Sequence, residues 1–339
     1  MDILQDVWFL LIGVLLIGYA ILDGFDLGVG VLHLFAKNEQ ERRIYLNAIG
    51  PVWDGNEVWL LTGGGALFAA FPVVYATVFS GFYLALMLLL MALIMRAVSM
   101  EFRGKVDAQG WKHVWDTLFG VGSLLPAVLF GVAYGNILRG IPLNADGMFT
   151  GSFLGLLNPY AILVGVLSLA TLVMHGAVYL TLKTDGQLQE RLAGLASRVW
   201  YAAVALYVIA TAATVYVSPF LFAGILTNFF FWLSAFLVVG ATYYVRVMVQ
   251  TKRFFKAFLA SSATITGMIG VSASSLFPRL VPSLTNLSYS LTVRNASSSE
   301  LTLTVMLVIA LIGMPLVVTY SIIIHRVFRG RVVIGPESY

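Results

Sequence analysis

Nine long apolar runs, separated by short polar segments, cover most of the chain. They occupy residues 7–36, 51–71, 73–100, 114–139, 157–183, 199–217, 228–250, 257–277 and 301–325. A helix needs about 20 apolar residues to cross the hydrocarbon core of a bilayer, and the runs are near that length. The pattern therefore predicts an all-α integral membrane protein with about nine transmembrane helices.

The second run, 51–71, is the least regular. Gly63, Gly64 and Gly65 interrupt it, and it meets the third run through a tight turn at Phe71 and Pro72. As a re-entrant segment it would leave eight spans and reverse the direction of every later helix. That reversal would also remove the asymmetry of charge between the two sides of the membrane.

Lysine and arginine concentrate in alternate connections. With the N-terminus outside the cytoplasm, 16 of the 20 Lys and Arg residues lie in the inner connections, which are 37–50, 101–113, 183–198, 246–256 and 325–339. The outer connections hold Arg139, Arg279 and Arg294, and Arg96 lies within a span. Because cytoplasmic loops carry the excess of basic residues, we predict nine spans, an outer N-terminus and a cytoplasmic C-terminus.

Composition narrows the class of protein. Of the 339 residues, 60% are hydrophobic and 11% are charged, whereas soluble domains carry about 25% charged residues. The net charge of +4 is spread over short loops and forms no patch for a nucleic acid. The absence of cysteine excludes disulfides and thiolate metal sites. Asp2 and Asp6 precede the first run, which therefore indicates a permanent helix and not a signal peptide.

The runs group into two sets of four and a last one. We predict a first four-helix bundle over 1–139, which carries the intramembrane acids, and a second over 140–277. Residues 278–339 would form an outer loop, a peripheral last transmembrane helix and a cytoplasmic tail.

Ionisable residues inside the first helix need a reason to be there, because each costs about 2.5 to 3.5 kcal/mol at the centre of a span. Asp23 and Asp26 are three residues apart and therefore share a helix face. Gly24 and Gly28 form a pair of small residues that lets another helix approach closely. This part of the helix is expected to be buried in protein.

The second helix begins with two further acids, Asp54 and Glu57, again three apart and between indoles. Arg96 lies toward the inner end of the third helix, and Glu101 and Asp116 lie nearest water. A series of carboxylates that starts at the cytoplasmic side is what a proton relay needs. The alternative is that the acids neutralise Arg96 and the inner Lys and Arg residues and hold the helices together.

The four histidines make a poor case for a haem or metal site. His33, His113 and His325 fall at inner helix ends, and His175 alone lies well inside a span. A single membrane histidine is more often a hydrogen-bonded packing residue than a ligand. Gly-x-Gly patterns such as the one at Gly28 lack the strand context of a dinucleotide site.

Several strings have a distinctive order, above all LDGFDLGVG at 22–30 and WDGNEVWL at 53–60. Others are Glu41–Arg43, Gly64–Pro72, Phe79–Tyr83, Gly131–Asn136, Leu157–Tyr160, Phe277–Pro278, Pro282–Ser283 and Ser298–Leu303. Together they resemble subunit II of the cytochrome bd quinol oxidases, along essentially the whole chain.

The resemblance implies a prokaryotic plasma-membrane heterodimer with a larger subunit I, which holds haems b and d and oxidises quinol. The complex would reduce dioxygen to water with cytoplasmic protons, and this chain would ligate no haem and catalyse nothing alone. Small single-helix accessory subunits accompany some members. Some also carry a structural quinone in this subunit, at a position that the sequence leaves open.

The resemblance also implies residue roles. Acids that match Asp54 and Glu101 are associated with a proton route to the haems, Asp26 and Arg96 with the stability or function of that site, and Trp59 with an oxygen passage. We therefore predict a path over Asp54, Glu101, Asp26 and Asp23, tuned by Arg96.

Two details of the path stay open. Glu57 stands where some relatives have Gln, which speaks against a titrating role. The sequence also leaves open whether Asp23 titrates or pairs with a neighbour.

Two other functions are compatible with the spans. A proton- or ion-coupled transporter would place polar sites in both halves of the chain, whereas the acids here lie in one half. A pure scaffold for a haem subunit would use the acids only for helix contacts.

Overall fold

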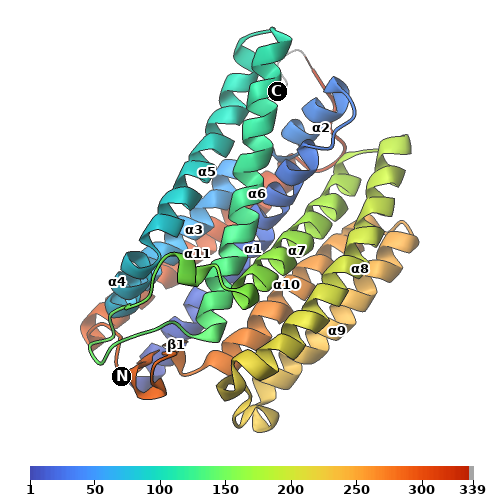
Figure 1. Cartoon of the computed structure of the whole chain (residues 1–339). Helices are drawn as coiled ribbons and strands as arrows, with labels where there is room; N and C mark the ends of the chain where they lie inside the picture. Colours follow the sequence, from blue (N-terminus) through green and yellow to red (C-terminus); the bar gives the residue numbers. More distant parts are fainter. Residues whose placement is uncertain (336–339) are drawn as a thin grey trace.

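A computed structural model describes residues 1–335 as a bundle of long helices with one small sheet (Figure 1). The helices are α1 (Asp2–His33), α2 (Glu39–Ile49), α3 (Trp53–Ala70), α4 (Pro72–Gly81), α5 (Tyr83–Phe102), α6 (Gln109–Arg139), α7 (Pro159–Lys183), α8 (Gly186–Val217), α9 (Phe229–Gln250), α10 (Phe254–Leu276) and α11 (Glu300–Val327). Short 3-10 turns lie at Arg103–Lys105, Leu154–Leu156, Pro219–Phe222, Ile225–Thr227 and Leu287–Tyr289. Strands β1 (Arg279–Val281) and β2 (Leu291–Thr292) pair antiparallel.

Eight helices within residues 1–335 are long and apolar enough to cross a membrane: α1, α5, α6, α7, α8, α9, α10 and α11. The chain is therefore a multi-pass membrane protein. The predicted second span is also a helix, α3, but Asp54, Asn56 and Glu57 in its first turns make it less apolar than those eight.

Helix α3 runs antiparallel to α1 over most of the length of α1. Asn56 near its start bonds Asp26 of α1, and Trp59 lies against Gly18. Ala70 at its end accepts a hydrogen bond from Ser298, whose neighbour Ser297 bonds Gln5 of α1. Its 18 residues rise about 27 Å, so α3 traverses the bundle and does not turn back as a re-entrant segment would.

Two details differ from the sequence expectation. The third run, 73–100, forms two helices, α4 and α5, which meet at Phe82. The inner connection 37–50 contains the helix α2, whose N-terminus is capped by Asn38 through a bond from the Glu41 N–H. Both features involve single residues, the aromatic Phe82 and the polar Asn38. A count of long apolar runs therefore does not detect them.

Helix α1 lies in the middle of the bundle (Figure 1). It contacts α3 and α6 on one side and α7 and α10 on the other. Helix α7 comes closest, because Gly28 and Gly176 face each other without side chains: a Cβ on Gly28 would lie 2.1 Å from the Leu172 carbonyl oxygen. The predicted close approach at Gly28 is therefore confirmed, with α7 as the partner.

Helix α11 lies at the periphery, where it contacts α1 and α3 and leaves most of its side chains exposed. It runs parallel to α1, because the amino group of Met1 lies 3.8 Å from Glu300 at its start. The opposite end of the bundle carries α2 and the α7–α8 connection (Figure 1). There the Val332 N–H bonds the Lys183 carbonyl.

Candidate functional site

A buried ion pair between α5 and α1 forms the centre of the first polar cluster. Arg96 donates through Nη2 to Asp23 Oδ1 at 2.6 Å and through Nη1 to Asp23 Oδ2 at 3.1 Å. Both side chains are completely buried. A bidentate pair of this kind holds the carboxylate plane as well as its charge. Asp23 is therefore paired with Arg96 in this structure.

Asp26 lies beside this pair without a close cation of its own. Its Oδ2 accepts a 2.8 Å bond from Asn56 Nδ2 and lies 3.9 Å from Arg96 Nη2. Its Oδ1 is buried and has no hydrogen-bond partner within residues 1–335. Asn56 also donates to the Leu22 carbonyl at 3.2 Å, which fixes the amide. Asp23 and Asp26 share one face, as predicted.

Glu57 connects the cluster with the surface of α3. Its Oε1 accepts a 3.1 Å bond from Arg96 Nη1, and its side chain is 26% exposed. Asp54, one helical turn earlier on the same face, is exposed. One guanidinium thus contacts three carboxylates, Asp23, Asp26 and Glu57, while Asp54 stands at the rim.

The other two predicted site residues lie apart from this cluster. Glu101, five residues after Arg96 on α5, is exposed near the inner end of the helix. Trp59 is buried against α1, where Gly18 makes room for it: a Cβ on Gly18 would lie 2.2 Å from the indole ring. Trp59 packs with Leu15 and Tyr19. The structure therefore brings Asp23, Asp26, Glu57 and Arg96 together, and leaves Asp54, Glu101 and Trp59 around them.

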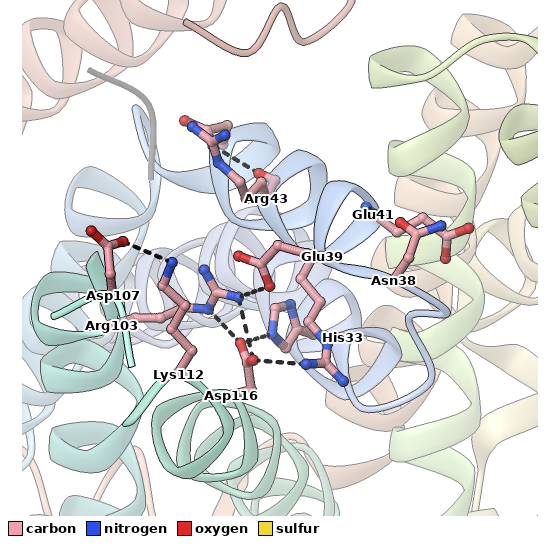
Figure 2. A network of polar contacts seen from close by, with 11 residues as sticks. His33, Asn38, Glu39, Glu41, Arg43, Arg103, Asp107, Lys112 and Asp116 are labelled. Carbon is pink, nitrogen blue, oxygen red and sulfur yellow. Dashed lines mark hydrogen bonds and ion pairs between the residues drawn. The ribbon is translucent and has the colours of Figure 1, made fainter. Parts of the chain in front are cut away.

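A second polar cluster at the basic end of the bundle is centred on Asp116 of α6 (Figure 2). Asp116 Oδ1 lies 2.6 Å from His33 Nε2 and 2.5 Å from Arg103 Nε. Its Oδ2 lies 3.1 Å from Arg42 Nη1. Arg103 also donates to Glu39 at 2.7 Å. One carboxylate thereby joins α1, α2, the end of α5 and α6.

The expectation that Asp116 lies nearest water is wrong. Asp116 and His33 are buried, at 4% and 1% exposure, because α2 covers the C-terminal end of α1 and the start of α6. In the sequence, both residues lie at inner helix ends. This shared position was the signal from which the cluster could have been found. Their burial depends on the position of α2, which no apolar run shows.

The chain is also similar to proteins of a known family. A profile of the family described as cytochrome bd terminal oxidase subunit II matches residues 4–328. The chain belongs to the cytochrome bd terminal oxidase subunit II family. It is therefore a subunit of a terminal oxidase, which is an oxidoreductase.

Relatives of this subunit II are similar over their whole lengths. A cytochrome bd ubiquinol oxidase subunit 2 from Bacillus subtilis is 40% identical over 97% of each chain. The cytochrome bd-I ubiquinol oxidase subunit 2 of Escherichia coli K12 is 38% identical over 98% of this chain and 96% of its own. A chain of the bd oxidase from Geobacillus thermodenitrificans has the same fold, with a TM-score of 0.79 at 19% identity over 97% of this chain and 99% of that one.

His175 of this subunit II does not fit a haem ligand. Both ring nitrogens of His175 are bonded within the protein, at 2.7 Å to Ser261 Oγ and 3.0 Å to the Ile21 carbonyl, and the ring stacks on Phe258. His33 is bonded to Asp116, and His325 Nδ1 lies 2.9 Å from the Ser321 carbonyl. Within the described residues, no group of three or more His, Asp or Glu side chains is placed to hold a metal ion. His175 is the hydrogen-bonded packing residue that the sequence favoured.

Proposed function

We propose that this chain is the haem-free subunit II of a quinol:oxygen oxidoreductase. It assembles with a larger subunit I, which carries haems b and d, and it supplies protons from the cytoplasmic side to the place where dioxygen becomes water. Two relatives are named ubiquinol oxidase subunits, which supports quinol as the electron donor of the complex.

The observation that carries the proton-supply role is the excess of carboxylates around Arg96. One guanidinium contacts Asp23, Asp26 and Glu57 in a site where two of the three acids are completely buried. Burying charges without partners is costly, so one cation does not balance three carboxylate charges. A cluster of this composition has a place for an exchangeable proton.

The order of the residues gives the path a direction. Protons enter at Asp54 on the surface of α3 and arrive at the buried Asp26 and Asp23. Glu57, one turn after Asp54, contacts Arg96, and the path does not require it to titrate. Glu101 at the inner end of α5 is a second surface carboxylate for the same route. Arg96 holds Asp23 and tunes the acids, and Trp59 shapes an apolar passage for dioxygen beside them.

A small cavity supports access from the basic end of the bundle. It measures about 10 Å³ and is lined by Asn56, Tyr320, Ser321 and His325 among others. That volume is about the size of one water molecule. Asn56 lines this cavity and also bonds Asp26. Only the side-chain amide of Asn56 would therefore separate a water in the cavity from the Asp26 carboxylate.

In this proposal subunit I packs against α3 and α5. Asp54 is exposed on α3, and the outer face of α5 carries the exposed side chains of Met87, Met91 and Ile94. A carboxylate at membrane depth is costly when it faces lipid. Gly65 on the same face of α3 has open space around its Cα, which allows another helix to approach closely.

The orientation follows from charge. The connections that end α1, α5, α7 and α9 carry the basic residues and meet at one end of the bundle, for example where Arg331 pairs with Asp185. Since basic loops stay in the cytoplasm, that end is cytoplasmic, and the start of α1 lies outside.

Neutralising the acids one at a time tests the relay. In the purified complex we expect Asp54→Asn and Asp26→Asn to lower quinol-driven oxygen consumption by roughly 100-fold or more, the range in which positioned proton transfer contributes. The haem content of the complex, read from reduced-minus-oxidised spectra, is expected to stay near wild type.

Three outcomes separate the relay from the alternatives. Unchanged oxygen consumption and proton uptake in both variants would exclude a relay through these acids. Loss of haem in proportion to activity would mean that the acids are a scaffold. Isolation of the chain without any haem-bearing subunit from haem-replete membranes would contradict the assembly itself.

A further inference from the structure

Helices α9 and α10 lie on the side of α1 opposite α5 (Figure 1). Side chains of these two helices line a groove between them. It has a volume of about 570 Å³. Small residues, Gly240 and Ala241 of α9 with Ala260 and Ala263 of α10, line it together with Phe236, Leu237 and Leu259. Its polar end is formed by Tyr244 and Lys256.

Lys256 is a cation without an ion-pair partner in the described part of the chain. No carboxylate within residues 1–335 forms an ion pair with it, whereas its neighbour Lys252 pairs with Glu190 at 2.9 Å. Arg253, three residues earlier, is exposed at the same end of the groove. The groove thus has apolar walls along its length. At its opening stands the positive charge of Lys256, which no described carboxylate pairs with.

The length of the groove decides what fits it. From Phe236 to Tyr244 the lining of α9 covers eight residue steps, about 12 Å along the helix. One leaflet contributes roughly 15 Å of hydrocarbon to a bilayer, whereas a transmembrane helix needs contact over about 30 Å. The groove therefore suits an acyl chain of one leaflet better than a helix of another subunit.

We propose that this groove binds an anionic phospholipid of the leaflet at the basic end of the bundle, with an acyl chain between α9 and α10 and the phosphate at Lys256. Basic residues at the membrane surface attract anionic headgroups. The small residues Gly240 and Ala263 leave room for the acyl chain. The site is independent of the proton path, since it lies on other helices.

The test titrates the delipidated, purified complex with phosphatidylglycerol and with phosphatidylcholine, and counts bound lipid by native mass spectrometry. Wild type is expected to bind one phosphatidylglycerol more tightly than phosphatidylcholine. Lys256→Gln is expected to weaken phosphatidylglycerol binding roughly five-fold, the effect of one basic residue near the surface. Ala263→Leu, which fills the groove, is expected to weaken the binding of both lipids.

Lys252→Gln is the matched control, because Lys252 lies at the same end but outside the groove. Equal losses in Lys252→Gln and Lys256→Gln would overturn the proposal in favour of unspecific surface charge. Equal affinity of wild type for the two lipids, unchanged binding in Ala263→Leu, or recovery of quinone in place of phospholipid from the groove would each overturn it as well.

Discussion

The two polar clusters of this chain differ in the ratio of acidic to basic side chains. Around Arg96 one guanidinium contacts three carboxylates. Around Asp116 one carboxylate accepts bonds from Arg42 and Arg103 and lies against His33. The first has spare acids and suits proton transfer, whereas in the second two arginines face two carboxylates, Asp116 and Glu39, which suits a structural link.

Asp116→Asn tests the structural link. The amide keeps the shape of the side chain but removes the negative charge, so Arg103 and Arg42 lose their common buried partner. Breaking a buried ion pair from one side costs about 3 to 5 kcal/mol, and the partial exposure of Arg42 places the expected loss at the lower end of that range. We expect a lower thermal midpoint of the purified complex, with the specific activity of intact complexes retained.

Asp107→Asn is the control for that prediction. Asp107 pairs with Lys112 at 3.2 Å in the same region, but its side chain is fully exposed. Exposed pairs contribute little to stability. A midpoint that drops equally in both variants would show that Asp116 stabilises the protein no more than a surface charge does.

At the scale of elements, the contact of α1 with α7 depends on two glycines. A Cβ on Gly28 would lie 2.1 Å from the Leu172 oxygen, and one on Gly176 would lie 2.6 Å from the Gly28 carbonyl carbon. Neither neighbour is the end of a flexible side chain, because both are backbone atoms. This contact keeps the first set of helices against the second.

Gly28→Ala is therefore expected to force α1 and α7 apart. Overpacking of a tight core costs about 1 to 3 kcal/mol and occasionally more, and Asp23 and Asp26 lie on the displaced helix. We expect a lower yield of haem-containing complex in detergent and a lower thermal midpoint.

Gly13→Ala is the matched control on the same helix. No heavy atom lies within 4 Å of the position that its Cβ would take, and alanine is a better helix former than glycine. Its complex is expected to match wild type in yield. If Gly28→Ala also matches wild type, the close approach of α1 and α7 is not needed for assembly.

At the scale of the whole molecule, α2 ties the first half of the chain to the second. Glu41 of α2 is bonded to Arg191 of α8 and accepts a 2.8 Å bond from the Lys37 N–H. Burial raises the pKa of Glu41, but the bonds from Arg191 and Lys37 outweigh burial and hold it below its ordinary value of 4.5. Glu41 therefore contributes stability above about pH 4.5, and the contribution is lost as the pH falls through the lower folded pKa.

Glu41→Gln should remove this contribution. We expect the variant to have a lower thermal midpoint than wild type at about pH 7, and the difference to shrink below about pH 4.5 as the wild-type carboxylate takes up a proton. Glu190→Gln serves as control, because Glu190 pairs with Lys252 on the exposed surface. A difference that is constant with pH would contradict the role of the Glu41 charge.

The predicted division at 139/140 and 277/278 stays a prediction. Helices α6 and α7 pack against each other across the first boundary, and α1 contacts α7 and α10 of the second set. The two sets of helices therefore share a common core. Helix α11 contacts α1 and α3 and leaves most of its side chains exposed.

The sequence by itself determined the membrane class and most of the long apolar helices. These properties are local, because an apolar run must match the bilayer and an intramembrane acid must be buried wherever the helix lies. The motif strings also determined the family. They correctly indicated that Asp23 and Asp26 share a face and that Gly28 lies in a close helix contact.

Only the tertiary structure decided which charges meet. Arg96 is 73 residues from Asp23, and Asp116 is 83 residues from His33, so their pairing depends on how α5 and α6 rotate and tilt against α1. The burial of Asp116 depends on α2, and the groove at Lys256 depends on the angle between α9 and α10. Side-chain partners across helices are set by packing in three dimensions, and the pattern along one chain carries no direct record of that packing.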